Sequence, residues 1–382
     1  MPLTDLERYT IDLMGINSYQ VDGKLEAIEY VRSILEQKTN AVIEVNTEIE
    51  PCLIARIEGS NSNFKLLLEG HLDVVNGEAH QFIPQKRGSM IYGRGSADMK
   101  SGCACILSAF IDAAQDTELK GDVTLVFTTD EETTGASIKH LFDNNHLGKH
   151  DFAMIPEPTN GQICNAHKGQ SWISVEFHGV SAHSSLPMLG QNAIYMAMDF
   201  VQVLRRNTQN YKEDPYFGKE SISVGVIEGG TDPNVVPDYA KVRIDKRYLP
   251  HQDVQTGLDE VQIALNECRE NDPMFRASVH LEGDWSGLLT EPDISCFPTV
   301  LDTISQQMNQ KTNIVYWTAW GEGAFISQYG IPTIYFGPGD TQLAHTQNEH
   351  VDMKQVHQVK QTYSSLINTL CGMTEYKTYL ID

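Results

Sequence analysis

The fold is decided by the stretch KLLLEGHLDVV at residues 65–75, in which a short apolar run ends in a histidine and an acid. Three consecutive leucines are typical of a strand that is buried on both faces of a parallel sheet. His71 and Asp73 follow this run directly. Because open α/β sheets bind their ligands beyond the carboxyl ends of the strands, this stretch predicts both a sheet and the edge that carries the chemistry.

Three further apolar runs are followed by side chains of metal-binding type. They are residues 123–127 before Glu131 and Glu132, residues 152–155 before Glu157, and residues 333–336 before His345. Asp98 adds a carboxylate shortly before a predicted helix at 101–114. Helical patterns at 3–14 and 25–35 and strand patterns at 41–45 and 53–57 complete this part of the chain. The alternation predicts an α/β fold with a mixed, mostly parallel sheet flanked by helices.

The pattern changes between residues 171 and 285. Apolar and polar residues alternate with a period of two at 172–177, 222–227 and 241–247, and apolar residues have helical spacing at 192–204 and 254–268. This pattern predicts a smaller α+β domain with one solvated sheet face. The fourth apolar run and His345 come after this block. We therefore expect a discontinuous domain of residues 1–170 and 286–382, interrupted by an inserted domain of residues 171–285.

Composition narrows the class of protein. With 382 residues, 41% of them hydrophobic and 21% charged, the chain is long enough for two or three folded domains. A net charge of −23 would repel phosphate backbones and anionic lipids, so we expect neither nucleic-acid nor membrane partners. Seven scattered cysteines, no CxxC spacing and no apolar leader favour reduced thiols and a cytoplasmic protein.

The predicted sheet edge gathers ligands for divalent cations. Two histidines with several carboxylates suit zinc or a neighbouring ion, and the excess of carboxylates suits two ions that share a bridging ligand. Asp73 would face the same side as His71 and could accept its second ring N–H, which fits a positioning role. Of the adjacent Glu131 and Glu132, one could bind metal while the other acts as general base. Each residue alone would more often be structural, so the prediction depends on their convergence.

Five motifs in order along the chain resemble the M20 family of metallopeptidases and deacylases. They are GHLDVV at 70–75, GRGSADMKSG at 93–102, TTDEETTG at 128–135, PEPT at 156–159 and GPGDTQLAHTQNEHV at 337–351. The resemblance implies a zinc-peptidase-like catalytic domain with an inserted lid and dimerisation domain. The implied ligands of two metal ions are His71, Asp98 and Glu157 for one ion and Glu132 and His345 for the other, with Asp98 bridging.

The same resemblance implies further roles. Glu131 would be the general acid/base, and the peptide bond between Asp98 and Met99 would be cis. Zinc is the expected metal, and cobalt or manganese would accept the same ligands. Gly339 would lie against the substrate.

Motifs in the inserted domain also resemble the family. They are GVSAHSSLP at 179–187, GGTDPNVVP at 229–237 and DKRYLP at 245–250. The resemblance implies a homodimer in which His183 stabilises the oxyanion in the partner subunit's site. It also implies that Asn234 and Arg247 bind the substrate carboxylate. The planar guanidinium of Arg247 matches a carboxylate. Without the resemblance, these segments could equally be ordinary turns and an edge strand.

One stretch departs from the family pattern and bears on the substrate. Many relatives have Asp after Thr where this chain reads TAWGEGAF at 318–325, with Ala319 and a first acid at Glu322. Glu322 could contact a substrate amine, as the resemblance to ornithine deacetylases suggests, or it could be an exposed acid at a helix N-terminus.

We therefore expect an enzyme like acetylornithine deacetylase or succinyl-diaminopimelate desuccinylase that hydrolyses a small N-acyl amino acid. Glu157 stands where aminopeptidase-like members of the family tend to have Asp, which favours a deacylase or carboxypeptidase. The alternatives are a carboxypeptidase or dipeptidase and, more remotely, a non-catalytic paralogue that binds amino acids.

Overall fold

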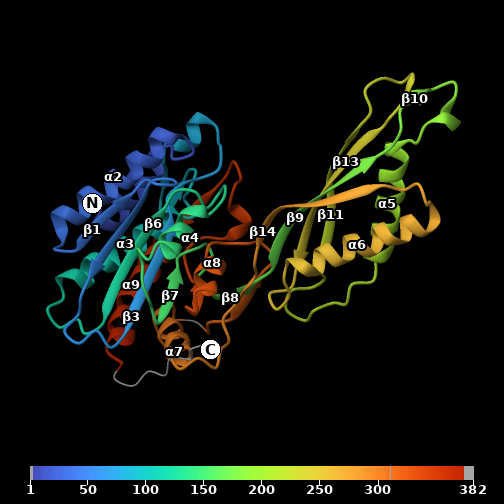
Figure 1. Ribbon diagram of the computed structural model, residues 1–382. Coiled ribbons are helices and arrows are strands. Elements are labelled where there is room, and N and C mark those ends of the chain that lie inside the picture. The colour runs from blue at the N-terminus through green and yellow to red at the C-terminus, as the bar shows by residue number, and fades with distance from the viewer. Residues whose placement is uncertain (1–2, 310, 374–382) are drawn as a thin grey trace. The chain divides into compact units, whose positions relative to one another are not determined.

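The structure, a computed structural model, describes residues 3–309 and 311–373 (Figure 1). Its main sheet has the strand order β1 (Val42–Asn46), β2 (Cys52–Ile57), β6 (Asp122–Thr128), β3 (Lys65–His71), β7 (Phe152–Ile155), β17 (Thr333–Tyr335), β8 (Ile163–His167) and β15 (Leu288–Leu289), and β16 (Ile314–Trp317) also pairs with β8. The central strands β6, β3, β7 and β17 are parallel, and β2 and β8 continue the sheet antiparallel. The predicted mixed sheet is therefore confirmed, and its parallel centre consists of the four apolar runs.

Helices in two groups flank this sheet. One group is α1 (Asp5–Gly15), α2 (Val21–Lys38), α3 (Lys100–Gln115), α7 (Phe297–Gln307) and α9 (Met353–Cys371), and the other is α4 (Ala136–Asp143) and α8 (Gly323–Gln328). A small antiparallel sheet contains β4 (Gln85–Arg87), β5 (Met90–Tyr92) and β18 (His350–Asp352). Short 3₁₀ turns are η1 (Ala79–Phe82), η2 (Pro187–Leu189) and η3 (Thr341–Leu343). Within the described residues, none of the helices combines the length and apolar character of a membrane span.

A separate antiparallel sheet has the order β11 (Ser221–Gly229), β13 (Tyr239–Tyr248), β9 (Gly169–His178) and β14 (Ala277–Trp285). In Figure 1, α5 (Ala193–Asn207) and α6 (Val254–Asn271) lie side by side along this sheet, and β10 (Ala182–His183) pairs with β12 (Val235–Val236) at one end. Buried residues such as Ile173, Phe177, Phe200 and Leu265 form its core. Alternating burial along β13 explains the period-two pattern in the sequence.

The chain divides into two units, of which the first holds most of the main sheet and the second holds the separate antiparallel sheet. The first comprises the described residues within 1–165, 290–315 and 321–382, and the second comprises 166–289 and 316–320. The insertion starts and ends within a few residues of the predicted positions, but one segment was assigned wrongly. Residues 316–320 pack with the second unit because Tyr316 contacts the ring of Tyr216, at 4.7 Å between centroids, and Trp320 Nε1 donates to Ser286 O at 3.1 Å.

His150, just before β7, should make the fold sensitive to acid. Burial lowers the pKa of His150 to about 4, and nearby Lys65 and Arg56 add to the effect. In the unfolded chain a histidine titrates near pH 6.5, so between pH 6.5 and 4 the unfolded state binds a proton that the folded state excludes. Stability therefore falls as the pH falls through this window. Between pH 7 and 5 we expect a loss of about 2 kcal/mol in the free energy of unfolding from this residue.

Urea unfolding at both pH values tests this expectation. His150→Gln should remove about 2 kcal/mol of the pH dependence, whereas the exposed His357→Gln should leave it as in the wild type. Equal pH dependence in the wild type and His150→Gln would show that His150 does not cause the acid sensitivity.

Candidate metal centre

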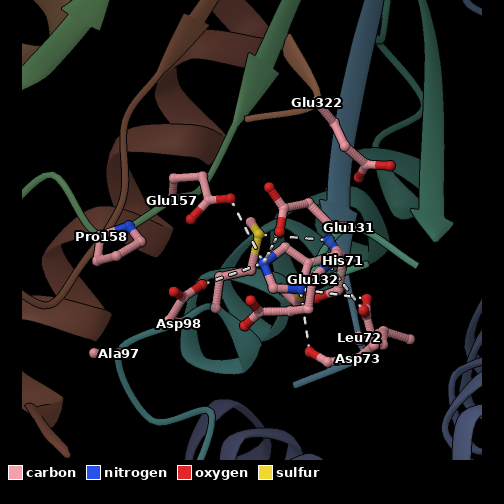
Figure 2. A network of polar contacts seen from close by, with 12 residues as sticks. His71, Leu72, Asp73, Ala97, Asp98, Glu131, Glu132, Glu157, Pro158 and Glu322 are labelled. Atoms are coloured by element: carbon pink, nitrogen blue, oxygen red, sulfur yellow. Dashed lines mark hydrogen bonds and ion pairs between the residues drawn. The ribbon is translucent and has the colours of Figure 1, made fainter. Parts of the chain in front are cut away.

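The parallel strands bring the predicted ligands to one sheet edge. His71 is the last residue of β3, Glu131 and Glu132 follow β6, and Glu157 follows β7. Figure 2 shows the side chains of Asp98, Glu131 and Glu157 around the imidazole of His71. The leucine run before His71 is fully buried and fixes β3 between β6 and β7. The convergence expected from the apolar runs is thus present.

Asp98 lies between two histidines and uses a different oxygen toward each. Its Oδ1 is 3.2 Å from His71 Nε2, and its Oδ2 is 3.3 Å from His345 Nε2. His71 Nε2 is also 3.6 Å from Glu157 Oε1, and His345 Nε2 is 3.1 Å from Glu132 Oε1. The cluster therefore consists of two groups that share Asp98, which is the arrangement that the resemblance implied.

Asp73 and Glu131 both lie close to the ring of His71. His71 Nδ1 is 3.1 Å from the backbone oxygen of Asp73 and 3.5 Å from its carboxylate, whose other oxygen accepts the Glu132 N–H at 3.1 Å. Asp73 thus contacts one ligand from each group. Glu131 Oε2 lies 4.0 Å from His71 Nε2, and the Asp98–Met99 peptide bond is cis.

Carboxyl groups outnumber imidazole groups in the cluster. Burial raises the pKa of Glu131 well above its usual value and that of Glu157 to about 7, and neighbouring carboxylates add to both effects. Hydrogen bonds with Asp98 and Glu132 raise the pKa of His345 to about 10. Burial without enough positive charge nearby thus disfavours the ionised carboxylates, whereas the same carboxylates favour the protonated imidazole of His345.

Divalent cations fit this donor set. One ligand atom each from His71, Asp98 and Glu132 lies within 4.8 Å of the others, and imidazole nitrogens with carboxylate oxygens are ligands that zinc-type ions accept. His71, Asp98 and Glu157 would hold one ion, and Asp98, Glu132 and His345 the other. Bound cations would also supply the positive charge that the carboxylates lack.

Two glycines allow the backbone to close around the cluster. A Cβ on Gly102 in α3 would lie 2.0 Å from the carbonyl oxygen of Pro156, which precedes a predicted ligand. Gly339 has a φ of 89°, and its Cβ would lie 3.1 Å from the Cα of Ala97. The predicted substrate residue Gly339 therefore has a packing role next to Asp98, irrespective of any contact with substrate.

A buried ion pair that was not predicted from the sequence supports the loops. Arg94 Nη1 is 2.6 Å from Glu349 Oε2, and both side chains are almost fully buried. Glu349 Oε1 accepts the backbone N–H groups of Ala97 and Asp98, at 2.9 and 3.2 Å, and Arg94 Nη2 donates to His345 O at 3.4 Å. Both residues lie within the quoted motifs, but a charged loop residue gives no sequence signal of burial.

Glu322 lies beside the cluster and is not the exposed helix-terminal acid that was one alternative. Its side chain is buried because it packs against Glu69 of β3, and its Oε2 accepts the Thr128 hydroxyl at 2.8 Å. Burial raises the pKa of Glu69 to about 8 and that of Glu322 well above its usual value, so the two carboxyl groups can share a proton in the hydrogen bond between them. Figure 2 shows Glu322 next to Glu131.

The remaining predicted residues lie in the second unit. His183 on β10 is exposed, and its Nδ1 is 2.8 Å from the Ser185 hydroxyl. The backbone oxygen of Asn234 accepts the Ser184 N–H at 3.1 Å, so these two loops are joined. Arg247 on β13 donates to Asp245, with Nε 2.9 Å from Oδ1, which fixes its guanidinium.

Known proteins resemble this chain in sequence and in fold. The model of peptidase family M20/M25/M40 matches residues 67–369. The chain is 31% identical over 339 residues to an acetylornithine deacetylase of Pectobacterium carotovorum, covering 84% of this chain and 83% of the relative. It is 29% identical over 303 residues to a succinyl-diaminopimelate desuccinylase of Corynebacterium glutamicum, covering 77% and 78%.

Among solved structures, the aminopeptidase PepT of Bacillus cereus has the same fold, with a TM-score of 0.80 at 16% identity over 97% of this chain and 98% of that one. The family model covers most of this chain. This chain is therefore a hydrolase that belongs to peptidase family M20/M25/M40.

Proposed function

We propose that this protein hydrolyses the amide bond of a small N-acyl amino acid with the help of two divalent cations, zinc in preference to cobalt or manganese. The observation that carries the proposal is the placement of Asp98 between His71 and His345, with Glu131 beside His71. The names of the two relatives, a deacetylase of acetylornithine and a desuccinylase, support a deacylase.

The reaction needs a base, an acid and stabilisation of negative charge. When bound, the cations would act as Lewis acids that polarise the scissile carbonyl and acidify water. Glu131 takes a proton from the attacking water and returns it to the nitrogen of the leaving amine. Asp73 holds the ring of His71, and His183 stabilises the oxyanion of the tetrahedral intermediate.

Different residues would bind the carboxylate and the side chain of the substrate. Arg247 and Asn234 would bind the α-carboxylate, and Asp245 holds the Arg247 guanidinium in place for this contact. Glu322 would bind an amine on the substrate, a role that its position next to Glu131 supports. Gly339 would also contact the substrate.

A substrate panel tests the proposal. The metal-loaded enzyme should cleave N-acetylornithine, N-succinyl-diaminopimelate or another N-acyl amino acid with a higher kcat/KM than any dipeptide. A preference for dipeptides would replace the deacylase by a dipeptidase or carboxypeptidase. If none of the substrates were cleaved and the protein bound no metal, the proposal that it catalyses amide hydrolysis would be wrong.

We further propose a homodimer in which His183 acts in the partner subunit's site, a role supported by the family resemblance and by the exposure of His183 on β10. His183→Ala and Glu131→Gln homodimers should each be nearly inactive. If subunits exchange at random, half the dimers are mixed, each has one intact site, and the mixture should regain about a quarter of wild-type activity. A mixture that stays inactive after proven exchange would place His183 in its own chain's site, and a monomer would exclude the arrangement.

We also propose a cytoplasmic location, which the seven free, buried cysteines support. Recovery of the protein from a secreted or periplasmic fraction would contradict this location.

A further inference from the structure

A second group of metal-binding side chains lies in the first unit and shares no residue with the Asp98 cluster. Glu48 comes from the turn between β1 and β2, His140 from the end of α4, and His146 from the segment after α4. One ligand atom from each of the three lies within 4.8 Å of the others. Because nearly a hundred residues separate Glu48 from the histidines, the tertiary fold brings the three together.

The imidazole of His140 has an unsatisfied nitrogen at this place. Its Nε2 is buried and makes no hydrogen bond with any residue that the structure describes, although Glu48 Oε2 lies only 3.0 Å away. The two atoms are close enough to be ligands of one ion but are not aligned as donor and acceptor. A buried ring nitrogen that makes no hydrogen bond is unfavourable, and coordination of a cation would remove this cost.

A carboxylate orients the ring of His146 so that it can bind a metal ion. Its Nδ1 is 2.6 Å from Glu44 Oε1, so Glu44 can accept the Nδ1 proton and leave Nε2 free for a metal. Metal-binding histidines commonly have such a carboxylate on the second ring nitrogen. Arg56 fixes this arrangement, because it contacts Glu44 Oε2 at 3.4 Å and also donates to the backbone oxygen of His146.

One neighbouring group must adjust. The Asn144 amide lies 3.1 Å from His140 Nδ1. Coordination through Nε2 places the ring proton on Nδ1, so Asn144 would have to present its amide oxygen there. Its side chain is exposed and can turn, with loss of the hydrogen bond that its Nδ2 donates to the His140 backbone oxygen at 3.0 Å. The side chain of Glu48 is 63% exposed, which leaves the site open to ions from solvent.

We propose that Glu48, His140 and His146 bind a further divalent cation of the zinc class, with a water molecule completing a tetrahedral site and Glu44 positioning His146. Two imidazole nitrogens and one carboxylate oxygen are a ligand set that zinc accepts readily. Because the ligands come from the β1–β2 turn and from the end of α4, the ion would join these two segments. The expected consequence is stabilisation of the folded protein by zinc.

Zinc stoichiometry of the full chain tests the proposal. After equilibrium dialysis at about 1 μM free Zn²⁺, the wild type should contain one more ion per chain than His140→Ala/His146→Ala. The matched control is His80→Ala, which removes an exposed histidine that lies 3.3 Å from Glu78, and it should keep the wild-type count. The double variant should also keep the wild-type turnover, which shows that it is folded and that the Asp98 cluster is intact.

Thermal unfolding gives a second readout. Zinc should raise the Tm of the wild type and of His80→Ala by more than that of the double variant. Equal zinc counts in the wild type and the double variant, or a difference that arises only at far higher zinc concentrations, would overturn the proposal. Since the test compares variants, it remains valid even if the Asp98 cluster binds one ion or none.

Discussion

Replacing Glu131 with glutamine is expected to lower kcat by about 10²–10⁴-fold and to leave KM nearly unchanged. Glutamine has the same shape but can neither accept the proton of water nor return it to the leaving amine. The position of Glu131 supports this separation of effects, because its Oε2 lies 4.0 Å from His71 Nε2, whereas Asp98 approaches the same nitrogen to 3.2 Å. Steady-state kinetics on the best substrate of the panel measure the effect.

Metal content distinguishes a base from a ligand. Glu131→Gln should keep both cations, whereas Glu132→Gln should lose affinity for the ion near His345, because Glu132 Oε1 lies 3.1 Å from His345 Nε2. Glu78→Gln, which removes an exposed carboxylate, is the control and should match the wild type in both measurements. If Glu131→Gln lost metal in proportion to activity, Glu131 would be a ligand and the assignment of the base would be wrong.

The sequence predicted an element correctly where a strong local pattern determines its structure. Three buried leucines before His71 predict a central strand, and β3 is that strand. Because parallel strands end at one sheet edge, the residues that follow each run could be expected to meet, although they are up to 274 positions apart (345 − 71). Local pattern and sheet geometry indicated which residues would meet, and the assignment of Asp98 as the shared ligand came from the family resemblance.

Buried charge could not be predicted in this way. Glu322 and Glu69 are buried because they face each other and Thr128, and neither residue carries a local sign of that contact. The segment 316–320 joins the second unit through ring contacts with residues about a hundred positions earlier in the chain. Such partners are chosen by the tertiary structure and not by neighbours in sequence.

The ion pair between Arg94 and Glu349 should control the geometry of the metal centre. Glu349→Gln keeps the size of the side chain but leaves Arg94 buried without its counter-charge, which we expect to lower the free energy of unfolding by about 3 kcal/mol. The acceptor for the Asp98 N–H weakens as well, and Arg94 is less firmly held against the backbone of His345. Both loops carry predicted ligands, so we expect affinity for the cations to fall by about 10–100-fold.

Loss of kcat/KM by about 10²-fold should accompany this change, because small displacements of positioned groups are costly in rate. The matched control is Glu50→Gln, which breaks the ion pair of another buried base in the same unit, with Lys24 Nζ 3.1 Å from Glu50 Oε1. Glu50→Gln should lower stability while leaving metal affinity and kcat/KM as in the wild type. Titration with zinc and urea unfolding of both variants separate the two roles. If Glu349→Gln behaved like Glu50→Gln, the pair would stabilise the fold without positioning Asp98.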